Sequence, residues 1–472
     1  MFYRLSPSYV LRGWDKMAWT LVKRPENQVK SLSADIFQVL LLCDGQTKIE
    51  EYLPDEALEK TLRQCEKEGW IEACESPCPL ETDQYYKYYH NRHVHMVFWS
   101  VTGRCNFRCR HCFMDAPEGM LGELSTEEAL DFIDQMADCG VLRVDLTGGE
   151  PFVRKDFWLL VDHILSYKIT IGKVYTNGWL LNEQILDEFE RRGLKPDISI
   201  SFDGIGWHDW MRGVAGAEEA ALRALRLCAE RGFKTDVEMC IHRGNQDLLE
   251  ETVQVLSGAG VTDLKTSNVA LTELWNCHSE GNALDWHEYV EAMIRYIPQY
   301  FKAGRPMNLI LANVIILNKD APYRIVPEAY NGTEKCLECY MCGNTRWSCY
   351  ITPDGRLLPC MPMTASQAQL KFPKVQDIGL KQGLSDSFYM QFVNGRIKDL
   401  FAVNGECATC SYRLKCGGGC RASALLEGNR NLMGCDRTMC MLWKEGYVDR
   451  IRKVTEEAIL KYEKNKKSAC HK

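Results

Sequence analysis

A chain of 472 residues is too long for one ordinary hydrophobic core, so we expect two or three domains. Its composition, 46% hydrophobic and 26% charged, is that of a globular protein, and its formal net charge of −7 favours neither a nucleic acid nor an anionic membrane as partner. No signal peptide is visible, and the longest apolar runs are too short to span a bilayer. We therefore expect a cytoplasmic protein with no membrane partner.

The 23 cysteines stand out against this background. Cytoplasmic thiols stay reduced, so disulfides are a poor explanation for so many of them. They also gather into three groups, at residues 105–112, 336–360 and 407–440. Grouped cysteines in a large chain of this kind favour metal ligation, whereas a scattered cysteine is more often a small core residue.

Residues 1–78 are predicted to form a small winged-helix-like module. The expected elements are a hairpin, a helix capped by Ser33 and ended by Gly45, a second helix and a closing strand, at 2–12 with 17–24, 34–44, 55–69 and 70–74. Winged helices often bind DNA, but residues 1–75 hold 10 Lys and Arg against 13 Asp and Glu. Because a DNA-binding face should be basic, we do not expect DNA binding.

A polar, aromatic linker is predicted at 79–94, and a run of six strand–helix units follows from 95 to 325. The expected strands lie at 95–102, 142–149, 169–178, 197–204, 234–242 and 263–269. This alternation predicts an α/β fold with a parallel sheet curved into a partial (β/α)6 TIM-like barrel. Barrels of this kind place their chemistry at the carboxyl ends of the strands.

The stretch GRCNFRCRHCF follows the first of these strands and holds Cys105, Cys109 and Cys112 in the spacing C-x3-C-x2-C. Three thiolates can hold three irons of a four-iron cluster and leave the fourth iron open. An open coordination position indicates a reactive metal site rather than a structural one. Zinc, with His111 as the fourth ligand, is the alternative that the spacing alone allows.

This stretch resembles the radical S-adenosylmethionine (SAM) superfamily, with His111 at the aromatic position of its C-x3-C-x-Φ-C motif. The resemblance implies a [4Fe–4S] cluster whose open iron chelates SAM. It also implies cleavage of SAM to methionine and a 5′-deoxyadenosyl radical, which abstracts a hydrogen atom from the substrate.

The following strand ends carry further matches to that superfamily. Glycines allow a close approach of the backbone, and a carboxylate suits the SAM ammonium group. Ribose, carboxylate and adenosine contacts are expected at the later strand ends. The residues that the resemblance implies for SAM binding are Gly148, Gly149, Glu150, Pro151, Asn177, Ser201, Asp203, Arg212 and Asn245.

Residues 326–445 are rich in turns and cysteines, and 446–472 are predicted to form an amphipathic helix and a tail. The cysteine-rich part has too little apolar periodicity for a core of its own, so metal would supply stability. Residues 407–420 have the spacing C-x2-C-x5-C-x3-C, and Cys342 and Cys360 bracket Gly355. A structural zinc ribbon is the alternative, but it would leave several of these cysteines without a purpose.

This pattern resembles the SPASM extension of radical SAM enzymes, which implies two auxiliary [4Fe–4S] clusters. One cluster would use Cys342, Cys360 and Cys420, with Cys336 as its uncertain fourth ligand. An open iron in that cluster would be able to bind a substrate thiolate. The other cluster would use Cys407, Cys410, Cys416 and Cys435, with Cys440 as a competitor for the last place.

Residues 4–75 resemble the RiPP recognition element, a module that binds the leader of a ribosomally made precursor peptide by adding it as a strand to a sheet edge. The whole combination resembles maturases that form thioether crosslinks in sactipeptides and ranthipeptides. We therefore expect oxidative crosslinking of a Cys sulfur to an acceptor carbon of a precursor peptide, with an electron donor such as flavodoxin or ferredoxin. Carbon–carbon crosslinking, another peptide oxidation and a sulfatase-maturase-like activity are the alternatives.

The sequence does not single out a catalytic base for the thiol proton. His242, His278 and Asp209 are conceivable from their places near strand ends. An isolated His or Asp at such a place is more often a structural polar group, so we assign no catalytic residue.

Overall fold

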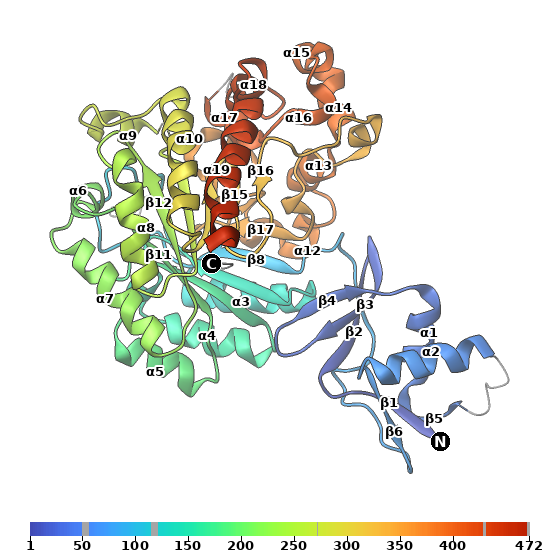
Figure 1. Cartoon of the computed structure of the whole chain (residues 1–472). Coiled ribbons are helices and arrows are strands. Elements are labelled where there is room, and N and C mark those ends of the chain that lie inside the picture. The colour runs from blue at the N-terminus through green and yellow to red at the C-terminus, as the bar shows by residue number, and fades with distance from the viewer. Residues whose placement is uncertain (50–55, 115–120, 271, 428–430, 470–472) are drawn as a thin grey trace.

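The structure is a computed structural model that describes residues 1–49, 56–114, 121–270, 272–427 and 431–469. The N-terminal module stands beside the barrel, and the cysteine-rich region lies over one end of the sheet (Figure 1). Among the described residues, no helix combines the length and the apolar character that crossing a bilayer requires.

Within its described residues, the N-terminal module contains two small sheets and two α-helices. Its sheets have the strand orders β5-β1-β6 and β4-β3-β2-β7. The elements are β1 (Phe2–Leu5), β2 (Tyr9–Trp14), β3 (Met17–Lys23), β4 (Gln28–Ser31), α1 (Ala34–Leu42), β5 (Asp44–Lys48), α2 (Glu56–Lys67), β6 (Ile71–Cys74) and β7 (Lys87–Tyr89). The predicted hairpin is confirmed, since Val10 in β2 pairs with Val22 in β3.

Three details of the module differ from the prediction. Residues 2–12 do not form one strand, because the amide of Tyr9 donates to the carbonyl of Ser6 at 2.9 Å and closes a turn with Pro7 at its second position. The first helix ends at Leu42 rather than at Gly45, which lies in β5 instead. The predicted linker contains β7, which pairs in parallel with β2.

The module docks at the amino ends of the barrel strands. The side-chain amide of Asn27 donates to the carbonyl of Leu142 at 2.5 Å and to the hydroxyl of Thr170 at 2.8 Å. Leu142 precedes β9 (Arg143–Thr147), and Thr170 begins β10 (Thr170–Thr176). The module therefore lies at the opposite end of the strands from the three-cysteine stretch.

All six predicted parallel strands are present. They are β8 (Met96–Ser100), β9, β10, β11 (Asp197–Ser201), β12 (Thr235–Ile241) and β13 (Asp263–Asn268). The helices and 3-10 turns that connect or follow them are α3 (Thr126–Asp138), η3 (Pro151–Val153), α4 (Phe157–Ser166), α5 (Glu183–Arg191), α6 (His208–Arg212), α7 (Ala217–Glu230), η4 (Gln246–Leu248), α8 (Leu249–Gly258), α9 (Glu273–His278) and α10 (Trp286–Lys302).

The sheet extends beyond the six units. Within the described residues it has eleven strands, because β14 (Asn308–Leu311), β15 (Ile315–Leu317) and β16 (Arg324–Ile325) continue one end. At the other end β17 (Ser348–Ile351) pairs in parallel with β8, and β18 (Leu357–Leu358) follows it. The cysteine-rich region therefore shares the sheet of the barrel instead of folding apart from it.

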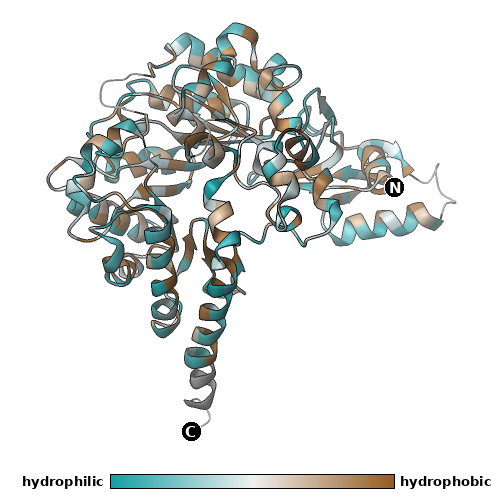
Figure 2. Ribbon diagram, turned by 90° about the horizontal axis from the view of Figure 1, so that it is seen from above, coloured by the Kyte–Doolittle hydropathy of each residue, from teal (hydrophilic) through white to brown (hydrophobic). Residues whose placement is uncertain are grey.

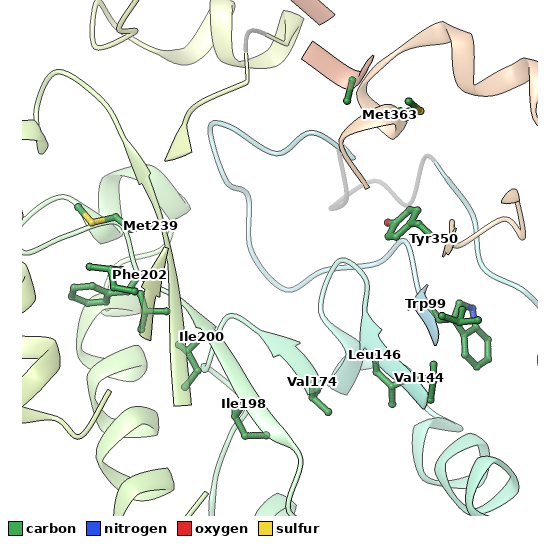
Figure 3. Close-up of a cluster of buried hydrophobic side chains, with 14 of the residues drawn as sticks. Trp99, Val144, Leu146, Val174, Ile198, Ile200, Phe202, Met239, Tyr350 and Met363 are labelled. Atoms are coloured by element: carbon green, nitrogen blue, oxygen red, sulfur yellow. The ribbon is translucent and has the colours of Figure 1, made fainter. Parts of the chain in front are cut away.

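The core runs across the whole sheet. Figure 3 shows side chains from successive strands, among them Trp99, Val144, Val174 and Ile198, and all four are fully buried. Tyr350 from β17 belongs to the same cluster. This shared core explains why residues after 326 fold despite their weak apolar periodicity.

The rest of the cysteine-rich region consists of short helices and turns. They are η5 (Glu334–Glu338), η6 (Asn344–Arg346), η7 (Met361–Ala365), η8 (Gln367–Lys371), α11 (Val375–Ile378), α12 (Leu380–Gly383), α13 (Phe388–Asn394), α14 (Ile397–Val403), α15 (Gly405–Thr409), α16 (Arg413–Cys416), α17 (Arg421–Glu427) and α18 (Arg437–Lys444).

The predicted C-terminal helix is α19 (Tyr447–Ala469), and residues 470–472 of the predicted tail lie outside the described residues. It packs against α10, where Arg450 Nη2 donates to Glu291 Oε2 at 2.7 Å. Figure 2 shows this helix running away from the body of the molecule.

Candidate functional site

The three-cysteine stretch follows β8 at the carboxyl edge of the sheet. The amide of Phe107 donates to Cys105 Sγ at 3.4 Å, and the amide of Cys112 donates to the carbonyl of Cys109 at 3.2 Å. None of the three cysteines forms a disulfide with a described residue. Burial raises the pKa of Cys105 to about 12, which disfavours the thiolate that a metal requires. A bound metal cation offsets this effect because its positive charge stabilises the thiolate.

The spacing of these thiols argues against zinc. Among the described residues, the one set of three candidate ligands with ligand atoms within 4.8 Å of one another is His111, Asp203 and Cys240. A zinc ion bonds sulfur at about 2.3 Å, which brings its thiolates closer together than this limit. The three loop thiols, with or without His111, are not gathered this closely, so the described residues hold no preformed zinc site there.

The glycines at 148 and 149 let the loop after β9 lie directly against the three-cysteine stretch. A Cβ on Gly149 would come within 2.2 Å of the carbonyl oxygen of Arg104. The amides of Gly149 and Glu150 donate to the carbonyls of Thr102 and Arg104, both at 2.9 Å. The close backbone approach predicted at these glycines is therefore an approach to the cysteine stretch itself.

Glu150 is completely buried behind this contact, and Pro151 starts the short η3 turn beside it. Its carboxylate accepts from the hydroxyl of Thr176 at 2.9 Å and from the amide of Asn177 at 2.8 Å, which joins the ends of β9 and β10. Burial raises the pKa of Glu150 to about 7, although these hydrogen bonds lower it. The side-chain amide of Asn177 lies 4.0 Å from Cys105 Sγ.

A buried ion pair lies on the other side of the stretch. Arg212 Nε donates to Asp203 Oδ2 at 2.6 Å, and Arg212 Nη1 lies 3.9 Å from Cys109 Sγ. Asp203 is fully buried, and the Arg212 guanidinium holds the pKa of its carboxyl far below its usual range against the effect of burial. A fixed cation beside a thiol can also bind the carboxylate of a small molecule.

Asn245 and Ser201 contribute differently from Arg212. The side-chain amide of Asn245 donates to the carbonyl of Asp203 at 2.7 Å and accepts from the amide of His242 at 2.8 Å. Asn245 is fully buried, so it shapes the loop after β12. Ser201 is half-buried at the end of β11, and its contact with the ribose remains a prediction.

Several polar atoms around this frame are buried without a partner within the described part of the chain. They are His111 Nδ1, His208 Nε2 and His242 Nε2. Buried polar groups are normally hydrogen-bonded, so these atoms fit a site that receives a polar molecule. Burial lowers the pKa of His111 to about 3, which keeps the ring neutral.

The three conceivable bases differ in their surroundings. Asp209 accepts from the amides of Gly216 and Glu218, both at 2.7 Å, and so caps the next helix. His278 is exposed. His242 is fully buried among aromatic rings, and burial lowers its pKa to about 4.

A clamp that the sequence interpretation missed ties the cysteine stretch to α6. Arg110 Nε donates to the carbonyl of Trp210 at 3.0 Å, and its Nη1 donates to Glu280 Oε1 at 2.7 Å. Trp210 Nε1 donates to the second oxygen of Glu280 at 3.1 Å, which closes the ring. A position inside the motif such as Arg110 can be noticed in the sequence, but its partner after α9 cannot.

The second predicted set of C-terminal thiols surrounds one small cavity. Its volume is about 30 Å³, and the cysteines that line it are Cys407, Cys410, Cys416, Cys435 and Cys440. Cys407 Sγ and Cys435 Sγ lie 3.7 Å apart. Five thiols around one cavity fit a four-iron cluster with one sulfur to spare, and Cys440 remains a competitor of Cys435.

The other predicted set is also gathered. Cys342 and Cys420 are close enough to Cys360 to add to the rise in pKa that burial causes there. Cys336 lies in η5, and its thiol neighbour is Cys339, the residue that follows this turn. The structure thus brings three of the four predicted thiols together, and Cys336 as fourth ligand remains a proposal. Cys349 is buried in the strand β17, which agrees with a packing role.

Asp436 is a second residue that the sequence interpretation missed. Its carboxylate is buried and accepts from the amide of Cys420 at 2.7 Å and from the amide of Met439 at 3.0 Å. It lies next to Cys435 in the chain, so it links the two thiol sets. The sequence signal that could have identified Asp436 is its position directly after Cys435, a predicted metal ligand.

Comparison with known proteins agrees with this arrangement. Residues 99–256 match the model of the radical SAM superfamily. The chain is 27% identical to mycofactocin maturase MftC of Mycobacterium tuberculosis (strain CDC 1551 / Oshkosh) over 337 residues, 70% of this chain and 79% of that protein. It is also 27% identical to PqqA peptide cyclase of Granulibacter bethesdensis (strain ATCC BAA-1260 / CGDNIH1) over 336 residues, 70% of this chain and 84% of that protein.

Among solved structures, the fold is similar to that of Streptococcus suis SuiB bound to its precursor peptide SuiA, with a TM-score of 0.65. The match covers 93% of this chain and 100% of that chain at 15% sequence identity. The similarity supports the predicted α/β architecture with its partial barrel and its flanking regions.

Proposed function

Because residues 99–256 match the model of the radical SAM superfamily, we propose that this chain is a radical SAM enzyme that oxidatively modifies a ribosomally made precursor peptide and that the product is a Cys thioether crosslink. One observation carries the proposal: the same chain holds the SAM-type cysteine stretch, two further gathered sets of thiols, and a module in which β4 is the edge strand of a sheet among the described residues. Proteins similar to this chain include mycofactocin maturase MftC and PqqA peptide cyclase.

The residues present fit a SAM-binding [4Fe–4S] cluster. Cys105, Cys109 and Cys112 would hold three irons, while Glu150 and Arg212 would meet the ammonium and carboxylate groups of SAM. When bound, the cluster and SAM supply a 5′-deoxyadenosyl radical that abstracts a hydrogen atom. The chain itself orients SAM with buried charges and keeps water from the reacting atoms.

The C-terminal thiols fit two auxiliary clusters in the same way. Cys342, Cys360 and Cys420, with Cys336 as a proposed fourth ligand, would hold one of them. Cys407, Cys410, Cys416 and Cys435 would hold the other. Clusters at these positions would exchange electrons with the reaction or with a small electron-carrier protein.

The N-terminal module would recognise the leader of the peptide. Strand β4 ends its sheet, with Gln28, Lys30 and Ser31 exposed. An edge strand can accept a further strand through main-chain hydrogen bonds. The proposal therefore separates leader recognition at the amino ends of the barrel strands from chemistry at their carboxyl ends.

Co-expression with a short peptide encoded beside the gene tests the function. A thioether crosslink removes one hydrogen from the Cys sulfur and one from the acceptor carbon, so the product loses the mass of two hydrogen atoms and one thiol that iodoacetamide can alkylate. A carbon–carbon crosslink loses the same mass but keeps the thiol. The variant Cys105→Ala should leave the peptide unchanged. An unmodified peptide with the intact enzyme would contradict the proposal.

A further inference from the structure

Arg421, the first residue of α17, is a buried cation outside the sites described so far. The residue is only 2% exposed. Within the described part of the chain, no Asp or Glu side chain forms an ion pair with its guanidinium. Taking a charge out of water costs free energy that an opposite charge normally offsets. A negative group other than these carboxylates is therefore needed near Arg421.

The hydrogen bonds that the guanidinium makes to described residues all go to the backbone. Arg421 Nη1 donates to the carbonyl of Gly434 at 2.7 Å and to the carbonyl of Leu432 at 3.1 Å. Its Nη2 donates to the carbonyl of Gly418. These carbonyls hold the guanidinium in place, but they carry no net charge and leave its own charge uncompensated.

Two of these carbonyls belong to the surroundings of a thiol site. The cavity of Cys407 is the small cavity lined by Cys407, Cys410, Cys416, Cys435 and Cys440. Gly418 also lines it, and Gly434 directly precedes Cys435. Burial raises the pKa of Cys407, and Arg421 is close enough to oppose that rise. The charge of Arg421 therefore lies directly behind the wall of this cavity.

The cations that line the cavity of Cys407 are in contact with solvent. They are Arg413, which is half-buried, and Lys444, whose side chain is 46% exposed. Lys444 also forms an ion pair with Glu406 at 3.4 Å. Water and salt screen exposed charges, whereas a buried charge acts through a medium of lower dielectric constant. Of these three cations, Arg421 is the one that solvent screens least.

We propose that Arg421 compensates the charge of the four-iron cluster in the cavity of Cys407 and raises its reduction potential. A four-iron cluster with thiolate ligands has a net negative charge, and reduction makes that charge more negative. A fixed cation nearby therefore stabilises the reduced form more than the oxidised form. Arg421 acts through space and is not a ligand. The inference rests on the proposed function, because it takes a cluster as the occupant of this cavity.

A redox titration of the reconstituted full-length enzyme tests this role. Electron paramagnetic resonance follows each cluster, and the signal that is missing from the Cys407→Ala variant identifies the cluster in question. Arg421→Gln removes the charge, so the midpoint potential of this cluster should become more negative. The cluster proposed for the barrel stretch should keep its midpoint potential. An unchanged midpoint potential of the cavity cluster in Arg421→Gln would overturn the proposal.

Two further variants separate the charge from the hydrogen bonds. Arg421→Lys keeps the charge and loses part of the hydrogen bonding, so its shift should be less than about half of that in Arg421→Gln. Lys444→Gln is the matched control, because it removes an exposed charge from the wall of the same cavity. Its shift should also be less than about half of that in Arg421→Gln. A shift in either variant as large as that in Arg421→Gln would contradict the role of the buried charge.

Iron analysis covers the case in which Arg421→Gln does not retain the cluster. Loss of about four irons per chain from Arg421→Gln but not from Arg421→Lys supports the role of the charge. Loss from both variants would show that the hydrogen bonds to the backbone matter instead, and would overturn the proposal.

The outcomes separate the inference from the proposed function. A negative shift in Arg421→Gln without modification of a co-expressed peptide by the intact enzyme supports the role of Arg421 and contradicts the crosslinking activity. Modification of the peptide together with an unchanged midpoint potential in Arg421→Gln supports the activity and overturns the inference.

Discussion

The thiols of the barrel and those of the C-terminal region have different surroundings. Around the barrel stretch, buried charged groups from several strand ends converge, with Asp203 and Arg212 on one side and Glu150 on the other. At the cavity of Cys407, the lining residues Glu406 and Lys444 form an ion pair at 3.4 Å whose two side chains are well exposed, and the buried carboxylate of Asp436 accepts backbone amides. The barrel site thus has buried side-chain charges that suit a charged small molecule, whereas the charges at the cavity of Cys407 lie at the surface or bind the backbone.

The largest effect is expected from removing one buried charge of the barrel site. Asp203→Ala leaves Arg212 buried without its partner, so the free energy of unfolding should fall by about 3–5 kcal/mol. Glu406→Ala removes an exposed pair and should cost less than about 1 kcal/mol. Chemical denaturation of the reconstituted variants measures both. Similar losses would show that the two regions do not differ as described.

Removing single thiols from the cavity of Cys407 sharpens the comparison. Because Cys435 lies against Cys407, Cys435→Ala should remove one auxiliary cluster, about four of roughly twelve irons per chain. Cys440→Ala should retain all of them. Iron and sulfide analysis decides between the two cysteines, and the reverse pattern would assign the ligand to Cys440.

The pH dependence of SAM binding tests the barrel site. The pKa of Glu150 is raised to about 7, so its carboxyl becomes protonated as the pH falls below that value and loses its attraction for an ammonium group. The dissociation constant for SAM should then rise by up to about tenfold per pH unit below 7. Glu150→Gln should bind more weakly and lose this dependence on the acid side. A wild-type affinity that is constant between pH 5 and 8 would contradict the role of Glu150.

The smallest expected effect concerns the clamp between Arg110, Trp210 and Glu280. Glu280→Gln removes a partly exposed charge, so the KM for SAM should rise only about twofold to fivefold. Arg110→Ala should give a larger increase, while the iron content stays unchanged. The electron paramagnetic resonance spectrum of the reduced cluster should still respond to saturating SAM. Loss of iron in either variant would mean that the clamp retains the cluster instead of positioning the stretch.

The barrel could be predicted because each strand carries its own apolar pattern, and each motif follows directly after a strand. Local patterns also placed the hairpin and the C-terminal helix. Three features depended on contacts distant in the chain. They are the strands β17 and β18 that join the sheet from the cysteine-rich region, the partners of Arg110, and the role of Asn245, whose amide donates to the carbonyl of Asp203, 42 residues earlier in the chain. The Ser-Pro turn that divides residues 2–12 was a local signal, and it was missed.

Iron and sulfide analysis combined with SAM cleavage tests the central claim most directly. The reconstituted enzyme and its Cys105/Cys109/Cys112 triple Ala variant would be prepared without oxygen, reduced and incubated with SAM. We predict about twelve irons falling to about eight, with formation of 5′-deoxyadenosine abolished. A variant that still forms 5′-deoxyadenosine, or an intact enzyme that contains zinc in place of iron, would contradict the assignment of the barrel stretch.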